Sequence, residues 1–399
     1  LMDHQANPGG QLDPKLVIGR DNIIRLLWDT LEQQSVRMNA ERRIGKTSII
    51  RKMCAEPREG WVPIFQDLEQ FHSAGEFAMG VYREVARFLT KRKLANRWAN
   101  ELLTKLGGTE VAGIIRLPGQ NGPVPWKEIL NSTVKDLVTG CEQQQERLLF
   151  LWDEVPFMLD NIKNNEGEDT AMQVLDTLRG LRQTYGARNL RMIITGSIGI
   201  HHVIHSLKEK GYANSPLNDT FAITVTPLAE EDAMLLAERL ISGEAIATEP
   251  ETYQETITAI AKLADSFPFY IHHIVKNIKL SQATATPEMV EQTVKRQLLS
   301  ADDPWELNHY RERLGTYYGQ SREGAAIAVL DALASTENAL STNDLLRELK
   351  GIGALDEREP LIKLLRLMEQ DHYLRRNDDG HYYFQFPLLR RWWHLSRGL

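Results

Sequence analysis

Two hydrophobic patterns alternate through the first 226 residues of the chain. Continuous apolar runs of strand length, such as "WVPIFQDL" (61–68) and "RLLFLWDE" (147–154), are separated by segments with apolar residues at helical spacing, such as "DNIIRLLWDTLEQ" (21–33). Strands that are apolar on both faces and alternate with helices are typical of a parallel sheet covered on both sides. We therefore predict an α/β fold with a parallel sheet at its centre.

From residue 229 onward the pattern is mainly helical. Amphipathic segments over 229–300 predict a helical lid, and 301–320 is a polar and aromatic connector that includes a helix. Three helices and then two strands joined by an Asp-Asp-Gly turn follow, which is typical of a winged helix. A stretch rich in glycine and proline predicts an insertion at 106–125. The predicted domains are a core (1–228), a lid (229–300), a connector (301–320) and a winged helix (321–399).

The segment "AERRIGKTSII" (40–50) ends in the Gly-Lys-Thr of a phosphate-binding loop, but Ala40 stands where the full pattern G-x-x-x-x-G-K-[ST] has a glycine. Gly45 lets backbone amides approach a phosphate closely. Lys46 would reach the β- and γ-phosphates, and the Thr47 hydroxyl would bind Mg²⁺. If position 40 required a positive φ, alanine would cost about 1–2 kcal/mol, which a folded domain can absorb. The alternative is a chance Gly-Lys-Thr at the start of a helix.

A second feature favours a working site. The apolar strand 147–154 ends in Asp153 and Glu154. A carboxylate at the end of a central strand can hold Mg²⁺ through its water shell, and the next can activate the attacking water. Together the two features predict a site for ATP and Mg²⁺, with Lys46 and Glu154 as catalytic residues and with Thr47 and Asp153 at the metal.

Two more strand ends carry polar side chains. The strand "RMIITGS" ends in Thr195 and Ser197, whose hydroxyls either sense the γ-phosphate or simply cap the strand. Asp67 and Glu69 follow another strand. They are the alternative pair for positioning water, or else solvated acids.

At these residues the sequence resembles the STAND-like, archaeal-type branch of the AAA+ P-loop ATPases. The resemblance runs from about residue 12 to 395, and its most specific parts are the phosphate loop and the Asp-Glu strand. The segments that carry it are "VIGR" (17–20), "AERRIGKTSII" (40–50), "LLFLWDEVPFML" (148–159), "IITGSIG" (193–199), "SPLND" (215–219), "SFPFYIHHIV" (266–275) and "YYFQFPLLRRWW" (382–393).

The resemblance implies roles for further residues. In that family the arginine-containing loop often starts with alanine or threonine, which favours a working site here. The family pattern implies that Ile18, Gly19 and Arg20 lie near the adenine and that the Pro268 segment of the lid faces the nucleotide. Ser266 departs from it, because the usual motif is Gly-x-Pro. The residues expected to line the phosphates are Arg43, Ile44, Gly45, Lys46, Thr47 and Ser48. The pattern assigns no arginine finger; the candidates for a neighbour's site in a nucleotide-dependent oligomer are Arg179, Arg182 and Arg188.

Charge and composition exclude several classes. The 47 basic and 54 acidic residues give a formal charge of −7, so no global field draws the molecule to nucleic acid or anionic lipid. Cys54 and Cys141 are the only cysteines, too few for a disulfide framework or a cysteine-rich zinc site. No apolar run approaches the ~18–20 residues that span a bilayer. We expect a cytoplasmic protein without a membrane partner.

Other features have structural explanations as well as functional ones. His201, His202 and His205 place imidazoles four residues apart on a helix, a spacing that can bind zinc, but no glutamate motif or cysteine accompanies them. His272 and His273 follow Pro268 and either pack in the lid or contact the nucleotide. A set of aromatic residues could stack on bases, but its alternating spacing favours the packed back of a wing: Tyr382, Tyr383, Phe384, Phe386, Trp392 and Trp393.

The charges of the winged helix leave its partner open. Residues 356–371, which include its third helix, carry three basic and five acidic side chains. That balance is poor for contact with DNA. Arg375 and Arg376 lie in the wing, and Arg390 and Arg391 add a second pair. DNA and a partner protein therefore remain alternatives.

The leading hypothesis is a slow, Mg²⁺-dependent ATPase that acts as a conformational switch between ATP and ADP states and changes the exposure of its winged helix. One alternative is an ATP-dependent DNA-binding loader or transposition-type helper. Another is a signalling or defence adaptor that senses a protein.

Overall fold

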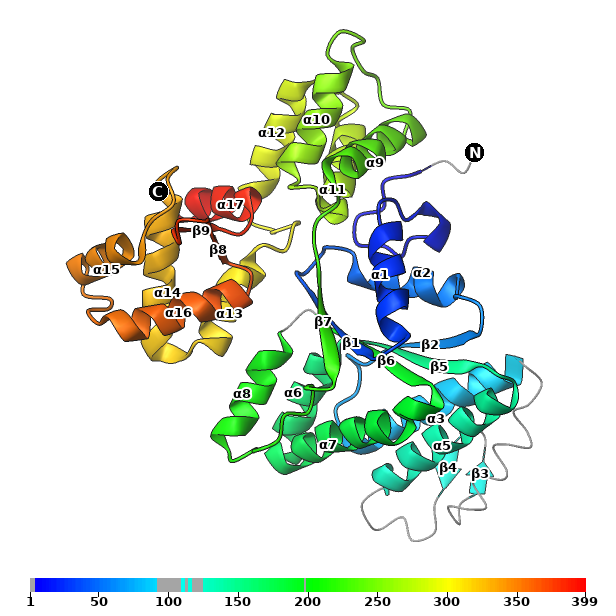
Figure 1. Cartoon of the computed structure of the whole chain (residues 1–399). Helices are drawn as coiled ribbons and strands as arrows, with labels where there is room; N and C mark the ends of the chain where they lie inside the picture. Colours follow the sequence, from blue (N-terminus) through cyan, green and yellow to red (C-terminus); the bar gives the residue numbers. More distant parts are fainter. Residues whose placement is uncertain (1–3, 92–108, 112–113, 117–124, 197–198) are drawn as a thin grey trace. The chain divides into compact units, whose positions relative to one another are not determined.

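The computed structural model describes residues 4–91, 109–111, 114–116, 125–196 and 199–399 (Figure 1). These residues form two compact units. The sheet unit comprises Arg20–Arg42 and Lys46–Thr226, and the helical unit comprises the residues up to Gly19, Arg43–Gly45 and Pro227–Leu399.

A parallel five-stranded sheet forms the centre of the sheet unit, as predicted. Its strand order is β2 (Trp61–Asp67), β5 (Arg147–Asp153), β6 (Leu190–Thr195), β1 (Ser35–Ala40) and β7 (Thr220–Val225). Every neighbouring pair in this order is parallel. The carboxyl ends of all five strands therefore lie along one edge, with β6 between β5 and β1.

Helices cover both faces of this sheet because its strands are apolar on both sides. In Figure 1, α1 (Asp21–Leu31) and α2 (Lys46–Ala55) lie on one side, and α3 (Ala74–Lys91), α5 (Trp126–Gln143) and α7 (Glu168–Tyr185) lie on the other. The other α-helices among the described residues of this unit are α6 (Val155–Glu166) and α8 (Ile200–Glu209). Two short antiparallel strands, β3 (Thr109–Val111) and β4 (Ile114–Arg116), fall within the predicted insertion.

The central strand β5 shows how both faces are buried. Leu148, Phe150 and Trp152 belong to the apolar cluster that includes α3, α5 and α7. The rings of Phe150 and Trp152 stack with their centroids 4.8 Å apart. Leu149 and Leu151 are also buried and point to the opposite face, because successive side chains alternate along a strand. Pairing with β2 and β6 sets the position of the carboxyl end of β5, where Asp153 lies opposite Asp67.

In the helical unit, four helices follow one another after residue 227. They are α9 (Glu230–Gly243), α10 (Tyr253–Leu263), α11 (Pro268–Ser281) and α12 (Pro287–Leu298). They occupy the region predicted as a lid. The helix α13 (Asn308–Tyr317) lies in the predicted connector. The boundaries drawn between core, lid, connector and winged helix stay predictions.

The C-terminal module, which we define as residues 319–397, has the element order predicted for a winged helix. It contains α14 (Gly319–Ala334), α15 (Thr342–Gly351), α16 (Arg358–Gln370), and the antiparallel strands β8 (Leu374–Arg376) and β9 (Tyr382–Phe384). Ser341 caps α15 in a capping box with Asp344. A final helix, α17 (Pro387–Arg397), was not predicted.

The aromatic residues at the end of the chain pack inside this module. Tyr382, Phe384, Trp392 and Trp393 are each at most 5% exposed. The indole N–H of Trp393 donates to Asp331 of α14 at 2.8 Å. These rings therefore belong to the core of the module, which is the structural explanation given above. Among the described residues, no helix has the length and apolar character needed to cross a membrane.

Candidate functional site

The loop after β1 does not require a glycine at position 40. Ala40 is the last residue of β1 and pairs with Val225 of β7, and it is not among the residues with positive φ. Within the loop 41–45, the residues with positive φ are Arg43 (φ +67°) and Gly45 (φ +98°). Alanine at position 40 therefore carries no backbone penalty, and the loop reaches the start of α2 without the first glycine of the motif.

Lys46 and Thr47 open α2, and both meet the acidic end of β5. The Thr47 hydroxyl donates to Oδ2 of Asp153 at 2.6 Å. The Lys46 Nζ lies 3.7 Å from Oε1 of Glu154, with the two side chains only 7% and 14% exposed. The first turn of α2 presents backbone N–H groups that have no partner within the helix, which is the usual basis of a phosphate site. The structure thus brings together the two features that the sequence placed about a hundred residues apart.

Local geometry at the end of β5 holds the two acids in different directions. Asp153 is the last residue of the strand, and its Oδ1 accepts the backbone N–H of Glu154 at 3.1 Å. Glu154 adopts φ +57° as the residue before α6. A left-handed residue turns the chain sharply between strand and helix, at a cost of about 1–2 kcal/mol for a side chain with a Cβ. Such strain at a strand end is common where a side chain is held for function.

Burial dominates the electrostatics of this edge. It raises the pKa of Asp153, and the charges of Glu154 and Asp67 add to this, while Lys46 and the Thr47 hydroxyl act in the opposite direction. Burial also raises the pKa of Glu69, and the charges of Glu154 and Asp67 contribute. Asp67 lies directly opposite Asp153 in the β2–β5 register. A divalent cation would stabilise such a cluster of carboxylates.

The donors present fit Mg²⁺. Hard divalent cations prefer oxygen ligands, and Mg²⁺ is usually held by one or two protein oxygens together with water and phosphate oxygens. The Thr47 hydroxyl and the Asp153 carboxylate offer two oxygens 2.6 Å apart. Their predicted role at the metal stays a prediction, and the distance between them is compatible with it.

The strand β6 ends between the loop strand and the acidic strand. Its last residue, Thr195, lies opposite Met38 of β1 and is 2% exposed. The Thr195 hydroxyl has no hydrogen-bond partner within the described part of the chain. A buried hydroxyl without a partner is costly, so a ligand oxygen is a natural partner for it. Ser197, the other predicted hydroxyl, lies outside the described residues.

Two other predicted residues of the sheet unit have simple environments. Arg20 is 5% exposed and donates through Nη1 to the carbonyl oxygen of Thr226, just beyond β7, at 2.8 Å. Ser48 lies in the first turn of α2, next to Thr47. The contact of Arg20 with adenine stays a prediction, and the structure shows that its guanidinium also ties the start of α1 to the end of β7.

The remaining predicted contacts belong to the helical unit. Gly19 has φ +69°, and a Cβ there would lie 2.6 Å from the Cβ of Asp232 in α9. Backbone conformation and packing therefore both require glycine at this position, whether or not it contacts a nucleotide. Ile18 is half-buried, Ile44 is 1% exposed, and Pro268 is the first residue of α11. Their predicted contacts with the nucleotide stay predictions.

Ser266, which replaces the expected glycine of the lid motif, takes the conformation that glycine would favour. Its φ is +58°, and that of Asp265 is +48°. The Ser266 carbonyl accepts the backbone N–H of Leu228 at 3.0 Å. The substitution therefore keeps the turn and costs about 1–2 kcal/mol of backbone strain.

Arg43 has partners that the sequence did not reveal. Its Nε donates to Oε2 of Glu306 at 3.0 Å, and its Nη2 donates to the other carboxylate oxygen. Its guanidinium also lies over the ring of Phe269, 4.6 Å from the centroid. The partners lie more than 220 residues away along the chain, and no local pattern indicates them. Its predicted position on the phosphates stays a prediction.

Two of the three arginine-finger candidates, Arg182 and Arg188, are engaged within the sheet unit, whereas the Nε of Arg179 is buried and has no hydrogen-bond partner in the described part of the chain. Arg182 is 5% exposed and binds Asp219 through two hydrogen bonds of 2.9 Å, while its Nη2 also donates to the carbonyl of Pro216 at 2.5 Å. Arg188 forms an ion pair with Glu142. This finding explains the "SPLND" segment: its aspartate anchors a buried arginine of α7.

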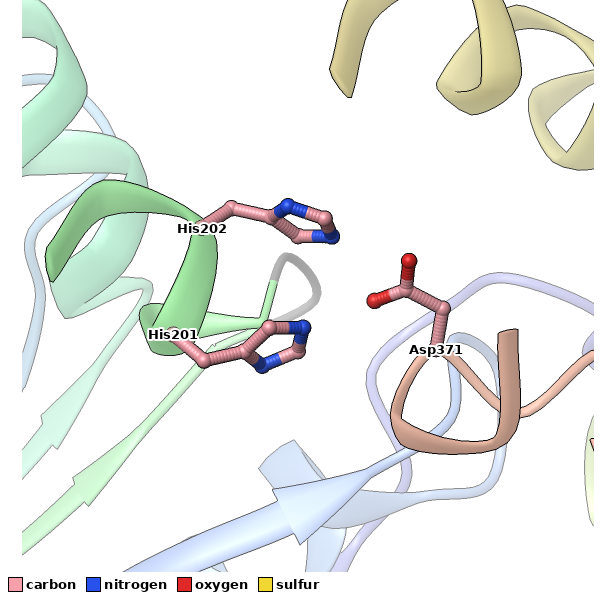
Figure 2. Close-up of side chains that lie close together, drawn as sticks. All are labelled: His201, His202 and Asp371. Carbon is pink, nitrogen blue, oxygen red and sulfur yellow. The ribbon is translucent and has the colours of Figure 1, made fainter. Parts of the chain in front are cut away.

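The histidines of α8 do not make a zinc site by themselves. Figure 2 shows the rings of His201 and His202 side by side, with their centroids 4.4 Å apart. His205 pairs with Glu209 at 3.3 Å. Two imidazoles are fewer than the four ligands of a structural zinc site. Asp371, also drawn in Figure 2, belongs to the helical unit, where it accepts the Tyr318 hydroxyl at 2.7 Å.

The histidines of α11 pack within the helical unit. His272 is 4% exposed, and its Nδ1 accepts the backbone N–H of Asn7 at 3.1 Å. Burial lowers the pKa of His272 to about 4. Burial, with a contribution from the charge of Arg43, also lowers the pKa of His273 to about 4. Both rings are therefore neutral near pH 7, as expected for packed histidines.

Comparison with solved structures identifies the architecture. A Walker-type ATPase of Pyrococcus abyssi superposes with a TM-score of 0.64 at 16% identity, over 95% of this chain and 96% of that one. The ORC2 protein of Aeropyrum pernix, solved in ADPNP and ADP complexes, superposes with a TM-score of 0.54 at 10% identity, over 98% of this chain and 94% of that one.

The fold is that of the P-loop ATPases. No family model matches the sequence, and no curated protein matches it. The P-loop ATPase fold places a loop after the first strand and an acid at the end of another. These are the positions that Lys46, Thr47 and Asp153 hold in the sheet unit.

Proposed function

We propose that this protein binds and hydrolyses ATP with Mg²⁺ and uses the reaction as a slow conformational switch. The observation that carries the proposal is the convergence of Lys46 and Thr47 on Asp153 and Glu154 at one edge of the sheet. The A. pernix ORC2 protein, solved with ADPNP and ADP, has the same fold and supports a nucleotide as the ligand.

Each side chain has a role set by its chemistry. Bound Mg²⁺ would neutralise charge on the β- and γ-phosphates. Thr47 and Asp153 would hold the ion, and Lys46 would stabilise the phosphate charge. Glu154, the residue directly after the proposed metal-binding carboxylate, would take a proton from the attacking water. It pairs with Lys46, so each of these two side chains has a partner of opposite charge.

A direct contact supports coupling between the lid region and the C-terminal module. The turn before α11 carries Asp265, whose Oδ2 accepts the backbone N–H of Leu388 in α17 at 2.5 Å. Phe267 of the same turn packs edge-on against Phe386, with the ring centroids 4.9 Å apart. A movement of the Pro268 segment would therefore act directly on α17. We propose that the protein belongs to the AAA+ class and its STAND-like branch, with the C-terminal module as a winged helix; the phosphate loop, the Asp-Glu strand and the P-loop ATPase fold support this.

Turnover of a Glu154→Gln variant tests the proposed chemistry. The amide cannot accept the proton of water, so ATP hydrolysis should fall by about 100-fold or more, while ATP binding persists. Glu69→Gln is the matched control, because Glu69 is another acid whose pKa responds to the charge of Glu154, and it should keep its rate within a few-fold. Hydrolysis by Glu154→Gln at the wild-type rate would rule out the assignment.

The charge of the wing favours a protein partner over DNA. Arg376 is paired with Glu369 of α16 at 2.9 Å, so half of the basic pair in the hairpin is neutralised. The alternative functions of loader on DNA and of protein-sensing adaptor differ in this respect. We favour the adaptor as the second candidate.

A further inference from the structure

A basic cleft lies in the helical unit beside α17. Two adjoining cavities of about 260 and 270 Å³ share Glu337, Arg390 and Arg391 among their lining residues, so they form one depression. Its walls come from α12, the segment after α14, the β8–β9 hairpin and α17, which lie close together in Figure 1. We call this depression the basic cleft.

The charges of the cleft are not balanced. Its lining includes four cationic side chains, Lys295, Arg375, Arg390 and Arg391, against the single carboxylate Glu337. Arg390 and Glu337 pair with each other at 3.0 Å, and Arg390 also donates to the carbonyl of Thr336 at 3.1 Å. The charges of Lys295, Arg375 and Arg391 are left without a carboxylate among the lining residues, in a chain that is acidic overall.

Asp265 is the other acid that affects these arginines. It lies in the turn before α11 and accepts the backbone N–H of Leu388 in α17, and the charges of Arg391 and Arg375 act on its carboxyl. Because burial raises the pKa of Asp265 to about 7, its negative charge is only partly developed near neutral pH. It therefore compensates the two arginines incompletely.

The floor of the cleft is apolar. Leu333, Phe384 and Pro387 line it, and Tyr383 adds an aromatic ring with the Arg375 guanidinium 4.5 Å from its centroid. Each cavity is smaller than the ~300–1,000 Å³ of typical ligand pockets, a size that suits single side chains. An apolar floor with a basic rim complements a peptide that carries a hydrophobic side chain between carboxylates.

We propose that the basic cleft is a docking site for an acidic peptide segment of a partner protein, with an apolar side chain in the cavity and carboxylates on Arg375, Arg391 and Lys295. Nucleic acid fits less well. Its phosphates would gain from the same charges, but it has no apolar side chain for the floor, and the neighbouring region 356–371 is net acidic. The basic cleft shares no residue with the proposed nucleotide site, so peptide binding can be tested apart from ATP binding.

Fluorescence anisotropy with defined probes tests this proposal. The probes are a labelled peptide that alternates glutamate and leucine, the same peptide with lysine for glutamate, and a short labelled DNA duplex. We expect the full chain to bind the glutamate peptide and not the lysine peptide. Arg391→Glu should weaken binding by about tenfold or more and Arg375→Glu by several-fold, because each reverses a charge on the rim.

Arg366→Glu is the matched control, since Arg366 is an exposed arginine of α16 that does not line the cleft. The affinity of this variant for the glutamate peptide should differ from that of the wild type by less than about twofold. Thermal unfolding checks that each variant folds; Arg375 lies on the exposed hairpin, so its variant keeps the test valid if Arg391→Glu is unstable. The proposal is wrong if the glutamate peptide does not bind or binds the cleft variants as it binds Arg366→Glu. The proposal is also wrong if Arg391→Glu weakens binding of the DNA duplex but not binding of the glutamate peptide.

Discussion

A single carboxylate joins two helices of the helical unit. Asp265 adopts φ +48° in the turn before α11, and it accepts the backbone N–H of Leu388 at the start of α17. A negative charge is favourable at a helix N-terminus, but burial opposes it more strongly and raises the pKa of Asp265 to about 7. The link between lid region and C-terminal module is therefore sensitive to the protonation of one side chain.

The pH dependence of unfolding tests this view of Asp265. Because its folded-state pKa is raised from 3.8 to about 7, the contribution of this group is fully present below about pH 4 and is lost as pH rises toward and through 7. Asp265→Asn keeps an acceptor for Leu388 without a charge. Above pH 7 its free energy of unfolding should exceed that of the wild type by about 1–2 kcal/mol, and near pH 4 the two should agree.

Urea unfolding at the two pH values measures the difference between variant and wild type, which removes the contributions of other titrating groups such as His272. The exposed Asp302 offers a control, since Asp302→Asn should follow the wild type at both pH values. A difference between Asp265→Asn and wild type that is the same at both pH values would contradict the account.

Three of the non-glycine residues with left-handed backbone lie in segments predicted to surround the nucleotide. Arg43, Glu154 and Ser266 have φ values between +57° and +67°. A sequence pattern locates such turns through glycine, so it directed attention to position 40, where the chain is extended. The pattern could not show which side chains would bear the strain, because tertiary packing decides that.

At the scale of elements, the buried pair Arg182–Asp219 attaches the segment before β7 to α7. The guanidinium makes two hydrogen bonds to the carboxylate and one to the carbonyl of Pro216, and the arginine side chain is 3% exposed. Removing one member of such a pair leaves polar groups buried without partners.

Arg182→Leu should therefore destabilise the sheet unit by about 3 kcal/mol, measured by chemical unfolding. The matched control is Arg188→Leu, because Arg188 makes a similar pair with Glu142 but its side chain is 41% exposed, and it should cost much less. If the two variants lose the same stability, the pair at Arg182 does not have the structural role assigned here.

The elements themselves could be predicted where the hydrophobic pattern was strong. Apolar strands such as 147–153 and amphipathic helices such as 74–91 follow directly from side-chain periodicity. The strand order could not be predicted, because periodicity does not state which strands pair. Only the structure shows that β6 lies between β5 and β1 and so places Thr195 between the ends of those two strands. The same holds for Arg43–Glu306, whose members are 263 residues apart.

At the scale of the whole molecule, the two units contain different parts of the proposed mechanism. In the sheet unit, Thr47 lies within hydrogen-bonding distance of Asp153, and Lys46 lies within ion-pair distance of Glu154. The helical unit holds the Pro268 segment, its link to α17 and the basic cleft. A switch of this design would convert nucleotide state in one unit into the position of a docking surface in the other.

Calorimetric titration with ATP and Mg²⁺ tests the central claim most directly, by comparing the wild type with Lys46→Ala. The control is Lys52→Ala, on the same helix, where the lysine pairs with Glu56 at 3.3 Å. The account predicts that Lys46→Ala binds ATP at least about tenfold more weakly, because a charge-assisted contact with phosphate is lost, while Lys52→Ala binds like the wild type. Equal affinity in Lys46→Ala and wild type would contradict it.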